Sequence, residues 1–79
     1  MEQRKFIQLH NTLTIIQKKD FVNYLILQNE SKPQEIEIAR ALLNVKIDTI
    51  ELLQKAMLEN NVEISEHRFE KLFNPLKDF

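Results

Sequence analysis

The sequence predicts an all-α fold, a single domain built as a compact bundle of four to five short helices. Three observations lead to this prediction. The chain has no glycine, which removes the residue that tight hairpin turns most often use. Apolar residues recur at spacings of three and four along most of the chain, which is the period of a helix buried on one side. With 79 residues, 43% of them hydrophobic and 29% charged, the chain is typical of a globular protein with one core.

The first two helices are expected at about residues 3–17 and 20–29, with Asp20 as the cap of the second. The core stripe of the first helix is expected to contain Phe6, Leu9, Leu13 and Ile16. The second segment is apolar on several sides, so it must be surrounded by other helices or lie in a subunit interface. One continuous helix over residues 3–29 is the alternative interpretation.

A break in the pattern separates these segments from a third helix at about residues 32–43. Ser31 and Gln34 have the spacing of a capping box, and Pro33 lies in the first turn, where its missing N–H costs nothing. Asn44 is expected to end this helix, because asparagine tolerates the left-handed backbone that often follows a helix.

Two more helices are expected at about residues 48–60 and 65–73. Asp48 begins a second capping box, and Ser65 is the expected cap of the last helix. Leu53 lies on the apolar stripe of the fourth helix. We therefore expect Leu53 to be fully buried where the third and fourth helices meet.

The composition excludes most kinds of chemistry. The chain has no cysteine, hence no disulfide or thiolate site, and without glycine it cannot form a P-loop or a nucleotide-binding fingerprint. No polar set converges on a pocket, so we expect no catalysis, no cofactor, no metal site and no small-molecule substrate. No apolar run is long enough to span a membrane. A cytoplasmic protein is expected, and the Lys-, Ile- and Asn-rich usage suggests a bacterial or phage source.

One segment carries a motif. Residues 35–57 combine an Ile-Ala-Arg-Ala-Leu helix, a short turn at Asn44 and a capped second helix that opens Asp-Thr-Ile. This segment resembles a helix-turn-helix, which implies a DNA-binding transcriptional regulator whose second helix enters the major groove. Under this alternative, the residues that contact DNA would be Lys46, Thr49, Gln54 and Lys55. The exposed side of the second helix also carries Asp48, Glu51 and Glu59. Carboxylates oppose binding to phosphates, and this argues against nucleic acid as a partner.

The main functional expectation is a small non-enzymatic protein that binds another protein as a regulator, inhibitor or adaptor. An immunity-type protein that neutralises a toxin is a further alternative and differs only in its partner. Apolar residues that lie off the expected core stripes predict the contact surface, on a protein partner or on a second copy in a homodimer. These residues are Ile7, Ile15, Val22 and Ile26.

Overall fold

The all-α prediction is confirmed. The computed structural model describes residues 1–28 and 30–79, and over these residues the chain is 74% helical, with five α-helices and no strand. The α-helices are α1 (Gln3–Thr12), α2 (Ile15–Gln28), α3 (Pro33–Leu43), α4 (Ile50–Glu59) and α5 (Glu66–Phe73), and a short 3₁₀ helix, η1 (Asn74–Asp78), follows α5.

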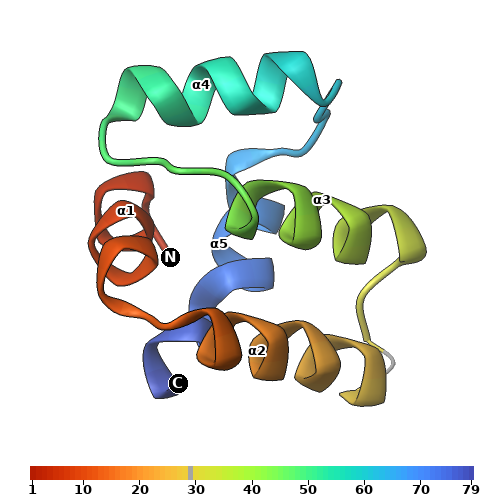
Figure 1. The fold of residues 1–79 in the computed structure, drawn as a ribbon. Coiled ribbons are helices and arrows are strands. Elements are labelled where there is room, and N and C mark those ends of the chain that lie inside the picture. Colours follow the sequence, from red (N-terminus) through yellow and green to blue (C-terminus); the bar gives the residue numbers. More distant parts are fainter. Residues whose placement is uncertain (29) are drawn as a thin grey trace.

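Helix α3 lies in the middle of the arrangement. It packs against α2 on one side and α4 on the other, and it also contacts α5, which crosses behind it in Figure 1. Helix α1 contacts α4 and η1, so the first and last elements of the chain lie together. The Cα radius of gyration is 11.3 Å, close to the value of about 11.6 Å that is typical of a compact chain of this length.

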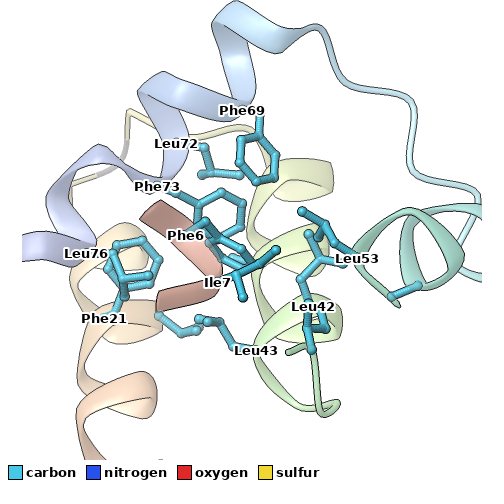
Figure 2. Packing of buried hydrophobic residues seen from close by; sticks show 14 of the residues in the cluster. Phe6, Ile7, Phe21, Leu42, Leu43, Leu53, Phe69, Leu72, Phe73 and Leu76 are labelled. Carbon is cyan, nitrogen blue, oxygen red and sulfur yellow. The ribbon is translucent and has the colours of Figure 1, made fainter. Parts of the chain in front are cut away.

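The core is built around aromatic rings from the two ends of the chain (Figure 2). The fully buried ring of Phe6 in α1 packs on Phe73 in α5, with ring centroids 4.6 Å apart, and on Phe69 at 5.4 Å. Phe21 in α2 stacks on the other side of Phe73 at 6.0 Å. Leu53 is fully buried and extends from α4 towards this cluster (Figure 2), as the sequence predicted. Aromatic pairs at these separations add to the free energy of burial itself.

The boundary between α1 and α2 differs from the prediction, and the continuous helix over residues 3–29 is wrong. Helix α1 ends at Thr12, Leu13 is extended, and α2 begins at Ile15. The cause is a capping box at Thr14. Its hydroxyl oxygen accepts from the Gln17 N–H at 3.1 Å, and its own N–H donates to the Gln17 side-chain oxygen at 2.8 Å. Asp20 therefore lies inside α2, and the predicted end at Asn29 lies outside the described residues.

The other helix starts are shifted by one or two residues or are as expected. Helix α3 is preceded by Lys32, whose N–H donates to the Glu35 carboxylate at 3.1 Å, so the predicted cap at the preceding serine is wrong. Thr49 rather than Asp48 caps α4, because its hydroxyl accepts from the Leu52 N–H at 3.1 Å. The predicted cap of α5, Ser65, is confirmed.

Two asparagines mark helix ends in different ways. Asn44 ends α3 as predicted, but its φ of −92° is right-handed, so its tolerance of left-handed geometry is not used. Among residues 1–28 and 30–79, Asn61 is the one with a left-handed backbone, with a φ of 52°, just after α4. In a chain without glycine, asparagine is the residue that adopts this conformation at least cost.

Helix α2 is covered by the rest of the protein on one side only. Phe21 and Leu25 are buried, whereas Leu27 is 82% exposed and Ile26 is 43% exposed. Of the two interpretations of this segment, enclosure by other helices is therefore wrong, and a place in a subunit interface stays a prediction. One side of α2 packs on the core, and the other side presents apolar residues to solvent.

Candidate functional site

A cleft of about 640 Å³ opens between the start of α2, the end of α1 and the end of α3. In Figure 1, α1 lies at the left, α2 begins below it, and α3 ends near the centre of the fold. Apolar side chains form part of its lining, namely Leu13, Ile15, Val22, Leu43 and Val45. Its basic residues are Lys18, Lys19, Arg40 and Lys46, and its other polar residues are His10, Asn11, Asn23 and Asn44. None of the described lining residues is Asp or Glu. We call this surface the basic cleft.

His10 and Lys18 form a small network in the wall of the basic cleft. The His10 side chain is only 4% exposed, and its Nε2 lies 2.8 Å from the Leu42 carbonyl oxygen. A carbonyl oxygen can only accept, so Nε2 carries the hydrogen and Nδ1 is left as an acceptor. The Lys18 ammonium lies 3.3 Å from Nδ1 and donates to it. One contact thus anchors α1 on the last turn of α3, and the other holds the Lys18 cation in place.

Burial favours a neutral His10, although the hydrogen bond to the Leu42 carbonyl acts in the opposite direction and raises the pKa. Loss of solvation on burial is the main cause that lowers the pKa of His10 below its ordinary value of 6.5, and the positive charge of Lys18 lowers it further. Burial also lowers the pKa of Lys18 from its ordinary value of 10.5. Lys18 is half-buried beside a neutral imidazole, so its charge has no compensating anion within the network.

The other cations of the basic cleft differ in their surroundings. Arg40 pairs with Glu37 at 3.1 Å and Lys46 with Asp48 at 3.9 Å, and all four side chains are substantially exposed. Exposed pairs of this kind contribute about 0–1 kcal/mol, so their cations remain available to a ligand. Within the described part of the chain, neither Lys18 nor Lys19 takes part in a salt bridge.

The structure places two of the four predicted interface residues on the surface. Ile15 is 73% exposed and Ile26 is 43% exposed, whereas Ile7 and Val22 are 8% and 9% exposed and belong to the core. Val22 and Ile26 follow Ile15 by seven and eleven residues, so the three lie on the same side of α2. Of the predicted surface, only Ile15 and Ile26 remain exposed, and the largely buried Val22 lies between them on α2.

Ile16 is a residue that the sequence pattern misplaced. It was expected in the core stripe of the first helix, but it is 72% exposed. The break at Leu13 and Thr14 puts Ile16 into α2, where its direction is set by a different helix axis. The Thr-x-x-Gln spacing from Thr14 to Gln17 is the signal in the sequence that could have located this break.

The four residues of the DNA-binding alternative come from the loop after α3, the cap of α4 and the outside of α4. Lys46 lies in the basic cleft, and Thr49 uses its hydroxyl to cap α4. Lys55 pairs with Glu59 at 3.8 Å on the outside of α4, where Gln54 is also exposed. The loop between α3 and α4 spans residues 44–49, which is longer than the turn of three to four residues typical of a helix-turn-helix.

A second hollow of about 830 Å³ lies beside the start of α3 and the segment that joins α4 to α5. Its main charged feature is the ion pair of Glu35 and Arg68, in which Arg68 Nε and Nη2 donate to the two carboxylate oxygens at 2.8 and 2.5 Å. The hydrogen bond from Arg68 is the largest cause of the lowered pKa of Glu35. Lys32, Glu37 and Glu63 also line this hollow, so it carries charges of both signs and, unlike the basic cleft, presents no excess of cations.

Metal-binding clusters, membrane-spanning helices and similarity to known proteins would each point to a function. In the described residues there is no group of three or more His, Asp or Glu side chains that could hold a metal ion, and no helix is long and apolar enough to cross a membrane. No protein-family model, curated protein or solved structure matches the chain.

Proposed function

We propose that this chain is a small non-enzymatic protein that binds another protein, as a regulator, inhibitor or adaptor, through the basic cleft and the adjoining side of α2. The observation that carries this proposal is the exposure of Ile15, which lines the cleft, and of Ile26, which lies farther along the same side of α2. Apolar residues scattered singly over a surface need no explanation, but residues grouped beside a concave surface are typical of binding sites.

The shape of the surface supports a protein partner. Ile15 and Ile26 are eleven residues apart in one helix, so their Cα atoms are separated by about 16 Å at a rise of about 1.5 Å per residue. An elongated edge of this length, with an exposed apolar residue at each end, suits the side of a helix or a strand from another chain. The side chain of Val45, 42% exposed, faces the same cleft from the loop after α3 and widens the apolar area.

A capture experiment from the native cell tests the proposal. Wild type and the double variant Ile15→Glu plus Ile26→Glu are used as bait, and the captured proteins are identified by mass spectrometry. We expect the double variant to lose the partner that wild type captures, because each glutamate places a charge in the apolar contact.

The matched control is Leu58→Glu. Leu58 is 80% exposed on α4 and is not part of the basic cleft, so the same kind of substitution there is expected to leave capture unchanged. Thermal unfolding of all variants shows whether they remain folded. A double variant that is folded and still captures the same partner would contradict the proposal.

A further inference from the structure

The charges of this chain are segregated around the basic cleft. The whole sequence has 11 Lys and Arg residues and 12 Asp and Glu residues, a net charge of −1. Four of the basic residues and none of the described acidic residues line the cleft. A local excess of one charge on a nearly neutral protein creates a positive potential that attracts an anionic partner.

The cation deepest in this surface is held by the fold. Lys18 is half-buried and donates to His10, which is in turn fixed on the Leu42 carbonyl of α3. A partly desolvated cation without a counter-ion is unfavourable, and a carboxylate from a ligand would relieve this cost. Lys19 is adjacent and exposed, so it provides a second cation next to the first.

Apolar and basic residues alternate along the same side of α2. Ile15 is followed by Lys18 and Lys19, and then by Val22 and Ile26. We propose that the basic cleft binds an acidic amphipathic segment of a partner protein. Its apolar side chains pack on Ile15 and Ile26, and its carboxylates pair with Lys18 and Lys19. This inference rests on the proposed function and specifies the chemistry of the partner.

Charge also argues against a second copy of this chain as the occupant. In a twofold dimer both copies contribute the same surface, so each contact between two residues occurs twice. Pairing through the basic cleft would bring Lys18 and Lys19 of both copies together without a carboxylate from the lining to separate them. The like charges would oppose the contact, whereas an acidic segment would be attracted to it.

The test uses two synthetic amphipathic helical peptides of about 15 residues. Both carry the same leucine stripe, and they differ only in having glutamate or lysine at the positions that flank it. Binding to the full-length protein is measured by calorimetry, and the contacted residues are located by NMR chemical shifts. We expect the glutamate peptide to bind and to shift the signals of Ile15, Lys19 and Val45, and the lysine peptide not to bind.

Charge-neutralising variants make the test specific. Lys18→Gln plus Lys19→Gln is expected to weaken binding of the glutamate peptide by about tenfold or more, because both proposed ion pairs are lost. The matched control is Lys71→Gln plus Lys77→Gln, which removes two exposed lysines outside the basic cleft and is expected to leave the affinity within about twofold of wild type. Binding should also weaken between about 50 mM and about 500 mM salt.

Several results would overturn the inference. These are failure of the glutamate peptide to bind, equal binding of the two peptides, an equal loss in the control variant, or displacement of the glutamate peptide by micromolar duplex DNA. Sedimentation of the free protein as a dimer that dissociates in Ile15→Glu plus Ile26→Glu would instead identify a second copy as the occupant. If partner capture depends on Ile15 and Ile26 but the peptides bind without charge preference, the proposed function stands and this inference fails.

Discussion

Leu53 and Leu58 allow the packing of α4 to be tested with one substitution at two sites. Both are leucines in the same helix, but Leu53 is fully buried and Leu58 is 80% exposed. Replacement by alanine changes helix propensity by the same small amount at each site, so this contribution cancels in the comparison. The difference between the two variants therefore measures burial.

The expected loss at Leu53 is large. Removing three buried carbons costs about 2.4 kcal/mol at about 0.8 kcal/mol each, and the cavity left in the core brings the total to about 2–5 kcal/mol. At about 0.05–0.15 kcal/mol per residue, the whole chain is stable by about 4–12 kcal/mol, so Leu53→Ala removes a substantial share of it. Leu58→Ala is expected to change the free energy of unfolding by less than about 0.5 kcal/mol.

Urea unfolding followed by circular dichroism measures both effects. With a slope near 1 kcal/mol per molar urea, the midpoint of Leu53→Ala should lie about 2 M or more below that of wild type, whereas the midpoint of Leu58→Ala should not move detectably. Equal midpoints for Leu53→Ala and wild type, or equal losses in the two variants, would refute the orientation of α4 described above.

Four further outcomes are expected. Thr14→Ala should lower the free energy of unfolding by about 0.5–2 kcal/mol, because it removes the cap that starts α2. The pKa of Glu35 is lowered in the folded state, so its ion pair stabilises the protein above pH 4.5, and this contribution is lost as the pH falls through the folded-state pKa. In urea titrations at different pH values, Glu35→Gln should lack this part of the pH dependence. The pKa of His10 is also lowered in the folded state, so the free energy of unfolding should fall as the pH decreases below 6.5. If the urea midpoint does not change between pH 7 and pH 5, His10 is not buried as a neutral group. In a gel shift, duplex DNA should bind no tighter than the non-specific range of about 10⁻⁴–10⁻⁶ M. Selection of a consensus sequence whose binding depends on Lys46 would favour DNA over a protein as the partner.

The sequence by itself determined the features that depend on neighbouring residues. The absence of glycine and the spacing of apolar residues predicted an all-α fold, and local hydrogen bonding predicted the cap at Ser65. The burial of Leu53 followed from its place on the apolar stripe of a single helix. Such features are readable because the atoms that cause them lie within one or two turns of each other in the chain.

Only the tertiary structure decided which side of each helix meets another element. Ile7 and Val22 lie off the apolar stripes of their predicted helices, yet both are buried, because α1 packs on both α4 and η1 and α2 packs along α3. Ile16 was assigned to the core through a helix that ends four residues earlier. The direction of a side chain depends on where its helix begins and on how that helix is rotated against the others, and neither is fixed by the apolar residues alone.

The basic cleft is likewise a product of the tertiary structure. Its cations come from α2, α3 and the loop after α3, and no short stretch of sequence contains a basic patch. Lys18 and Lys46 line the same cleft because α2 packs along α3 and because His10 joins α1 to the end of α3. Electrostatic potential depends on distances in space rather than along the chain. The sequence could therefore identify the apolar residues Ile15 and Ile26 as a surface, but the charge of the cleft beside them emerged only when the helices were packed.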